Sequence, residues 1–134
     1  MLTDTSRWAL AARLAISLAR TGAEVAAICP TGHPLLKTRA VQQTFRYSGV
    51  RPLEALAAAI RDSQAEVVVA CDDRAVQHLH ELYAQARKAG PAGAKIAVVI
   101  ERSLGAPESF PVVSCRYDLL KIAREEGLDR KSVV

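Results

Sequence analysis

The chain has 134 residues, of which 50% are hydrophobic, 24% charged and only 4% aromatic, and its formal net charge is +4. This length and hydrophobic content suit one globular domain with its own core and exclude a disordered or fibrous chain. The basic residues are scattered, and their densest group, near the C-terminus, alternates with acidic residues as on a solvated helix face. This pattern argues against nucleic acid as a partner.

No apolar run approaches the length of a membrane span, and Arg7 and Arg13 interrupt the N-terminal apolar stretch where a signal peptide would be continuous. We therefore expect a cytoplasmic protein with no membrane partner. The cysteines Cys29, Cys71 and Cys115 form no CxxC pair, so neither a disulfide framework nor a structural zinc site is expected.

Short apolar runs alternate with helical patterns along the chain. In chain order, the expected elements are a strand stub at 1–4, a helix at 7–20, a buried strand at 23–29, an edge strand at 43–49, a helix at 52–63, a buried strand at 65–71, a helix at 74–88, a buried strand at 95–100 and a helix at 116–126. Ser6 and Asp73 are N-cap candidates, and Pro52 is typical of a first helical turn.

This alternation predicts an α/β fold. Because crossovers between parallel strands are right-handed, helices should cover both faces of the sheet. We therefore expect a Rossmann-like, open three-layer sandwich with a mostly parallel sheet of four to five strands.

Polar side chains follow three of the expected strands, at the edge where open α/β sheets bind their ligands. The candidate residues for binding a small-molecule substrate are Asp4, Thr5, His33, Asp72, Asp73 and Arg74. An arginine at this edge can hold a phosphate or a carboxylate. The alternatives without a binding role are that Asp73 only caps a helix and that Arg74 is a surface residue of the first turn of that helix.

Several familiar sites are absent from the sequence. There is no GxGxxG after the first strand, no GxxxxGK[ST] loop and no Gly-x-Ser-x-Gly elbow, which argues against a dinucleotide, a P-loop and a hydrolase nucleophile. His78 and His80 lie on different sides of a helix and cannot share a metal ion. His33, in the PTGHP loop, is the histidine to consider as an acid–base group.

Three segments carry a resemblance to a known family: TDTSRWALAARLAISLARTGAEVAAICP, EVVVACDDRAV and RSLGAPESFPVVSCRYDLLKIAREEGL. Together they resemble the N-terminal pre-ATP-grasp domain of ATP-grasp ligases, in the carbamoyl-phosphate-synthase-like and carboxylate–amine ligase branch. The resemblance covers residues 2–128. It implies a Rossmann-like domain at 1–113, a helix at 114–128 that leads toward an ATP-grasp region, and a non-native or truncated tail at 129–134.

The resemblance also implies an activity for the full enzyme. ATP and magnesium would convert a carboxylate into an acyl phosphate, which an amine then attacks. This domain would supply part of the carboxylate or amine pocket, lined by Asp4, Thr5, Asp72, Asp73 and Arg74. The ATP-binding lysines and magnesium ligands of the family have no counterpart here, so we expect no cofactor in this chain and no ligase activity from it alone.

Two alternatives stay open at this point. The chain is a standalone Rossmann-like module that binds a small ligand or a nucleotide, or it is a structural domain that forms a homodimer. In the second case an apolar ridge at Trp8 or at Leu79–Tyr83 would be exposed and self-associating.

Overall fold

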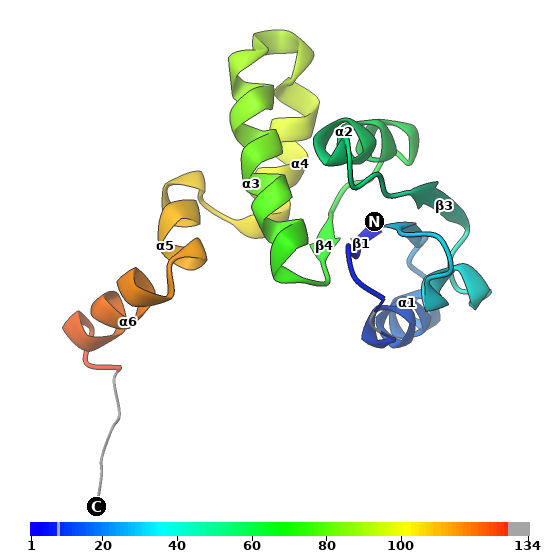
Figure 1. The fold of residues 1–134 in the computed structure, drawn as a ribbon, viewed down its shortest axis with the longest axis horizontal. Helices are drawn as coiled ribbons and strands as arrows, with labels where there is room; N and C mark the ends of the chain where they lie inside the picture. The colour runs from blue at the N-terminus through cyan, green and yellow to red at the C-terminus, as the bar shows by residue number, and fades with distance from the viewer. Residues whose placement is uncertain (8, 129–134) are drawn as a thin grey trace, which may run out of the picture. The chain divides into compact units, whose positions relative to one another are not determined.

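The structure is a computed structural model that describes residues 1–7 and 9–128 (Figure 1). The chain divides into two compact units, Met1–Leu104 and Gly105–Val134. The boundaries expected at residues 113 and 128 stay predictions, and Trp8 and the 129–134 tail lie outside the described residues. Within the described ranges, no helix has both the length and the apolar composition needed to cross a membrane.

The first unit holds the sheet and most of the helices. Its elements are β1 (Leu2–Thr3), α1 (Leu10–Arg20), β2 (Ala26–Cys29), the 3₁₀ helix η1 (Pro34–Lys37), β3 (Gln43–Arg46), α2 (Pro52–Asp62), β4 (Val69–Ala70), α3 (Asp73–Lys88), the 3₁₀ helix η2 (Gly90–Ala92) and α4 (Ala94–Leu104). The second unit contains η3 (Pro107–Ser109), α5 (Phe110–Ser114) and α6 (Arg116–Glu125). The helices expected at 52–63, 74–88 and 116–126 are confirmed.

All four strands are parallel, and their order in the sheet is β3-β2-β1-β4. Helix α1 lies on one side of the strands and α2 on the other (Figure 1). The expected Rossmann-like three-layer α/β fold is therefore confirmed, with four strands and with β3 as an edge strand.

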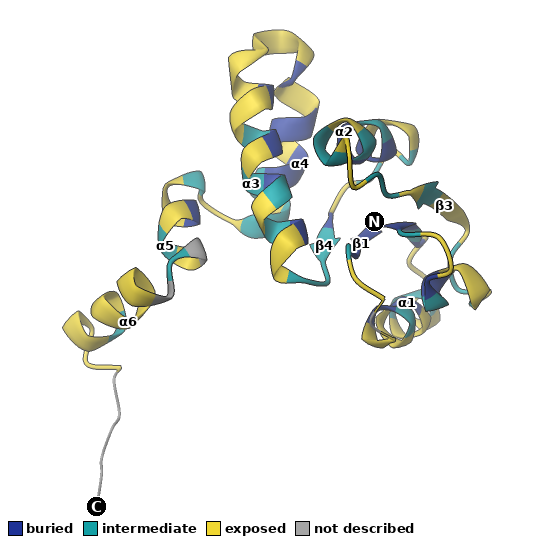
Figure 2. Cartoon of the chain, viewed as in Figure 1, coloured by how far each residue is buried: buried dark blue, intermediate teal, exposed yellow. Residues whose placement is uncertain are grey.

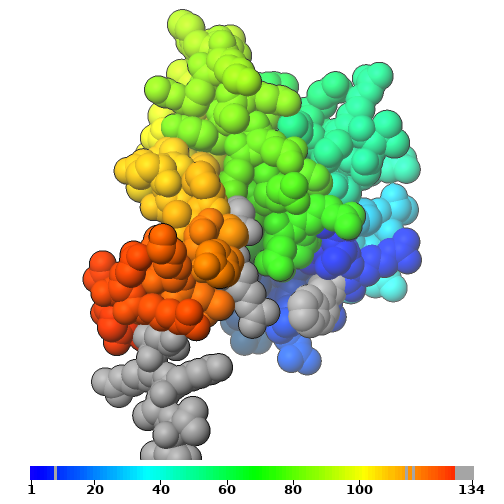
Figure 3. Space-filling view, turned by 60° about the vertical axis from the view of Figure 1, so that its left-hand side comes forward, coloured from blue at the N-terminus to red at the C-terminus, as the bar shows by residue number. Residues whose placement is uncertain are grey.

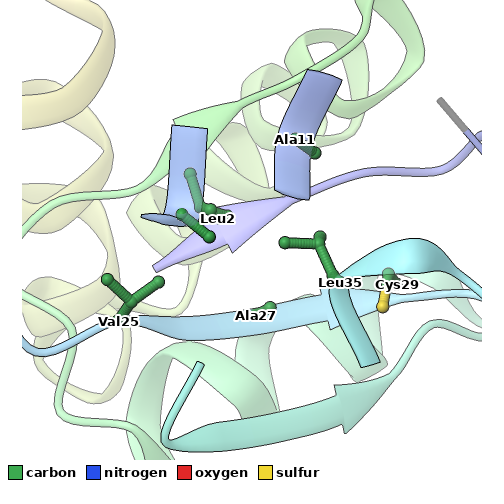
Figure 4. Packing of buried hydrophobic residues seen from close by; sticks show 7 residues of the cluster. Leu2, Ala11, Val25, Ala27, Cys29 and Leu35 are labelled. Atoms are coloured by element: carbon green, nitrogen blue, oxygen red, sulfur yellow. The ribbon is translucent and has the colours of Figure 1, made fainter. Parts of the chain in front are cut away.

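The α1 face of the sheet is packed with small side chains. Leu2 of β1 and Ala27 of β2 are in register and lie in one buried cluster with Ala11 and Ala15 of α1 (Figure 4). Leu35 of η1 closes this cluster and is fully buried. Alanines let α1 lie close to the strands, which explains how a chain with so few aromatic residues still builds a core.

The opposite face is covered by α2, and the helices α3 and α4 pack against α2. The buried residues of these three helices recur every three or four positions (Figure 2). The largest of them are Leu56, Ile60, Leu79, Leu82, Ile96, Val99 and Ile100. Helices α3 and α4 form a hairpin through η2. There Gly93 approaches the backbone of Ala86 so closely that a Cβ atom would clash with it.

The strand expected at 95–100 is wrong, because this segment is the middle of α4. Five apolar residues in a row, Ile96 to Ile100, fit a buried strand or a buried helix equally well, and the length of the run does not separate the two. Burial follows the helical period: Ile96, Ala97, Val99 and Ile100 are buried, while Val98 is 53% exposed.

The strand expected at 65–71 shrinks to the two residues of β4. Its partner β1 is equally short, so the pairing ends after Ala70. The backbone N–H of Val68 donates instead to Ser103 Oγ of α4, at 2.8 Å. Helix α4 thus stands beside this edge of the sheet and satisfies one of its unpaired amide groups.

The helical assignment of 95–100 predicts different costs for two neighbouring truncations. Ile100→Ala removes a fully buried side chain and should lower the free energy of unfolding by about 2–5 kcal/mol. Val98→Ala should change it by less than about 0.5 kcal/mol. Urea unfolding of both variants checks this, since in a strand the two residues would share a face and cost similar amounts.

Candidate functional site

The order of the strands places a topological switch point between β1 and β4. From β1 the chain moves outward through β2 to β3, then crosses back to β4 on the other side of β1. The carboxyl ends of β1 and β4 therefore diverge into loops on opposite faces, the arrangement in which open α/β sheets bind ligands. The expected convergence of the polar residues after these two strands depended on this order.

A carboxylate bridges the switch point. Asp72, which follows β4, accepts hydrogen bonds from the backbone N–H of Thr5 and from Thr5 Oγ1, the latter at 2.9 Å. It also accepts from Ala75 N at 2.8 Å and so caps α3. The cap is therefore Asp72 and not Asp73. In Figure 3 the dark blue surface of the N-terminal loop lies directly beside the green start of α3.

These hydrogen bonds change the acidity of Asp72. Burial by itself would raise the pKa of this carboxyl group, but the donors from Thr5 and Ala75 outweigh that effect and hold the pKa below its ordinary value of 3.8. Asp72 is thus a stable anion at neutral pH. Its position at the N-terminus of α3 also matches the positive end of the helix dipole.

Asp4 and His33 meet under the loop that follows β1, and both side chains are fully buried. Their Oδ2 and Nε2 atoms are 3.2 Å apart, without the geometry of a hydrogen bond. His33 Nδ1 accepts from the backbone N–H of Leu35 at 3.0 Å, so the proton of a neutral ring sits on Nε2 and faces the carboxylate. The pair therefore links η1 to the end of β1 rather than facing solvent.

The loop between β1 and α1 has its amide groups occupied. Asp4 Oδ1 accepts from Ser6 N at 2.7 Å and from Ser6 Oγ at 2.8 Å, while Asp72 takes the N–H of Thr5. Ser6 thus bonds Asp4 and does not cap α1, whose N-cap position is Ala9. A phosphate bound at this loop would need those same N–H groups. The carboxylates of Asp4 and Asp72 therefore take the place of such an anion.

The remaining predicted residues lie on the surface. Asp73 and Arg74 are both exposed in the first turn of α3. Cys29 is the last residue of β2 and Cys71 directly follows β4, the two strands that flank β1. Burial, with the negative charge of Asp4, raises the pKa of each thiol to about 11. Neither is therefore a nucleophile at neutral pH.

Two residues at this edge were missed by sequence reasoning. Tyr47 follows β3 directly, and its backbone N–H donates to Cys29 O at 3.0 Å, which holds it at the carboxyl end of β2. Its ring stacks on that of His78 of α3, with centroids 6.0 Å apart and planes at 25°. The position of Tyr47 after a strand was the available signal, but nothing in the sequence pairs it with α3.

Three cavities along the described residues differ in their relation to this edge. One of about 650 Å³ lies between α2 and α3, beside Arg51 and Gln85. A second, of about 500 Å³, lies at the opposite, amino ends of the strands, beside Met1. The third, of about 230 Å³, lies at the carboxyl ends of β2 and β3, beside Cys29 and Arg46, and so borders the edge that carries the polar cluster.

Among the described residues, no group of three histidine, cysteine, aspartate or glutamate side chains could hold a metal ion. In comparisons with models of protein families, with curated proteins and with solved structures, none matches this chain. The case for a function therefore depends on the geometry above and on the resemblance of the three segments.

The bridge predicts that the two adjacent aspartates differ in their effect on stability. Asp72→Ala should lower the free energy of unfolding by about 0.5–2 kcal/mol, because the N-cap and both bonds to Thr5 are lost. Asp73→Ala, the matched control on the exposed side, should change it by less than about 0.5 kcal/mol.

Because folding lowers the pKa of Asp72, its charge stabilises the fold above pH 3.8, and this contribution is lost as the pH falls through the lowered value. Urea unfolding at neutral pH and at steps below 3.8 should show the Asp72→Ala difference shrinking; a constant difference would contradict the bridge.

The buried pair predicts a second contrast. His33→Ala leaves the Asp4 carboxylate buried without its neighbour and should cost about 3 kcal/mol of unfolding free energy. Thr31→Ala, an exposed position in the same loop, is the matched control and should be nearly neutral. Thermal and urea unfolding compare the two, and equal losses would show that Asp4 and His33 do not hold η1 against β1.

Proposed function

We propose that this chain is the substrate-side domain of an ATP-dependent carboxylate–amine ligase of the ATP-grasp type, holding the non-nucleotide substrate at the carboxyl edge of its sheet. The observation that carries the proposal is the switch point between β1 and β4, where Thr5 and Asp72 from two distant segments meet. Ligand sites of open α/β sheets occupy this position.

The three segments of the resemblance map onto continuous parts of the structure. The first spans β1, α1 and β2, the second spans β4 and the start of α3, and the third runs from the end of α4 through α6. The first two segments therefore supply both sides of the switch point. This supports a shared role for them in one binding site.

The occupied amide groups argue against nucleotide binding at this edge. A Rossmann-like module holds phosphate with free N–H groups after its first strand, but here Thr5 and Ser6 donate theirs to Asp72 and Asp4. In the proposed ligase, ATP belongs to a different region of the enzyme. The geometry thus favours a substrate domain over the nucleotide-binding alternative.

A ligand titration of the 134-residue chain tests the proposal. A panel of small carboxylates and amines is added to ¹⁵N-labelled protein, and MgATP is added in a separate series. We expect saturable NMR shifts at Thr5, Ser6 and Asp72 from a carboxylate or amine and none from MgATP. Thr5→Val removes the hydroxyl contact to Asp72 and should weaken that binding about threefold to tenfold, whereas Thr21→Val, exposed at the C-terminal end of α1, should not.

Each other outcome points to a different function. Saturable MgATP binding at Thr5 and Ser6 would favour the standalone nucleotide module. A ligand-free dimer in sedimentation analysis, with no binding from the panel, would favour the structural alternative. The coding sequence of the source gene after the codon for Leu128 supplies the remaining test, because the ligase proposal expects ATP-grasp lysines and magnesium-binding acids there and fails without them.

A further inference from the structure

We propose that Tyr47, Arg74 and His78 form a subsite for an oxyanion, a carboxylate or a phosphate group, next to the switch point. The subsite rests on the proposed function only in that both place a ligand at the carboxyl edge of the sheet. Anion binding to the subsite is measured without any ligase activity. It lies between the exit of β3 and the first two turns of α3.

The hydrogen bond between Tyr47 and His78 determines which groups point outward. Tyr47 Oη lies 3.4 Å from His78 Nδ1. Burial, with the charge of Asp72, raises the pKa of the phenol despite Arg74, so its proton stays in place. When the hydroxyl donates to Nδ1, the proton of the neutral imidazole sits on Nε2. His78 then keeps one N–H donor for a ligand.

Arg74 supplies the positive charge beside that donor. It precedes His78 by one helical turn, so the two side chains share a face of α3. Its positive charge also opposes the rise in the pKa of the Tyr47 phenol that burial and Asp72 cause. No described carboxylate lies within ion-pair distance of Arg74, and a free guanidinium binds planar oxyanions through two parallel hydrogen bonds.

The acidic neighbours leave room for an anion. Asp72 already accepts three hydrogen bonds from Thr5 and Ala75, which spread its charge. Glu81, one turn beyond Gln77, accepts from that amide at 3.3 Å and is exposed. Asp73 adjoins Arg74 in the sequence but is turned about 100° around the helix. The subsite thus combines an arginine that has no ion pair among the described residues with an imidazole donor one helical turn away.

NMR titration with inorganic phosphate and, separately, with succinate tests the subsite at constant ionic strength. We expect saturable shifts at Arg74 and in the ring nitrogens of His78. Arg74→Gln should weaken binding about fivefold to tenfold, the loss of a charge-assisted hydrogen bond. Arg61→Gln, an exposed arginine on α2, is the matched control and should leave the affinity unchanged. The tighter of the two probes identifies whether the natural group is a phosphate or a carboxylate.

Tyr47→Phe separates the hydroxyl from the ring. The variant keeps the stacking on His78 but loses the donor to Nδ1, so the ¹⁵N shifts of the imidazole should report a mixture of tautomers. Anion affinity should fall about threefold. Unchanged tautomer and affinity would overturn the role of the phenol. Equal losses from Arg61→Gln and Arg74→Gln, or no saturable shift at Arg74, would overturn the subsite.

The two proposals fail separately. Phosphate or succinate binding that depends on Arg74, together with no substrate binding at Thr5 and Asp72, supports the subsite and contradicts the ligase proposal. Substrate binding at Thr5 with no effect of Arg74→Gln on any anion supports the substrate domain and overturns the subsite.

Discussion

The hydrogen bonds between Thr5 and Asp72 are the interaction on which the carboxyl edge depends. They join the loop after β1 to the N-terminus of α3, and so connect two segments 67 residues apart in the chain. Because β1 and β4 pair over only two residues each, the sheet itself offers little to align these loops. The side chain of Asp72 supplies that alignment, and its lowered pKa is the measure of how well its charge is stabilised.

The same bridge sets the electrostatic character of the site. In a phosphate-binding loop, the backbone N–H groups and the helix N-terminus are free to bind an external anion. Here Asp72 and Asp4 already accept hydrogen bonds from the N–H groups of Thr5 and Ser6, so these groups are not available to an external anion. Positive charge without an ion pair lies further along α3 at Arg74. Near Thr5 and Ser6, the amide donors of this edge are taken by aspartates of the chain itself. Near Arg74, the edge is open to an anionic ligand.

The side chains of Asp4 and His33 are fully buried beneath the loop that follows β1. They hold η1 against the end of β1, while the small residues of α1 allow the helix to pack close to the sheet. The α3–α4 hairpin buries its own apolar stripe and stands beside β4. The site therefore lies on a sheet of short strands. Side-chain hydrogen bonds align its loops more than strand pairing does.

The sequence by itself determined the α/β class, the edge strand β3, the helices α2 and α3, and the grouping of Asp4, Thr5 and Asp72 at one edge. These follow from local periodicity and from the rule that parallel strands end together. The helix at 95–100 and the pairing of Tyr47 with His78 were decided only by the tertiary structure. A run of five apolar residues is compatible with a strand or a helix until its neighbours select one face for burial. Likewise, β3 and β4 are the outer strands of the sheet, and a tyrosine after β3 can reach α3 only because α2 packs against both β3 and α3.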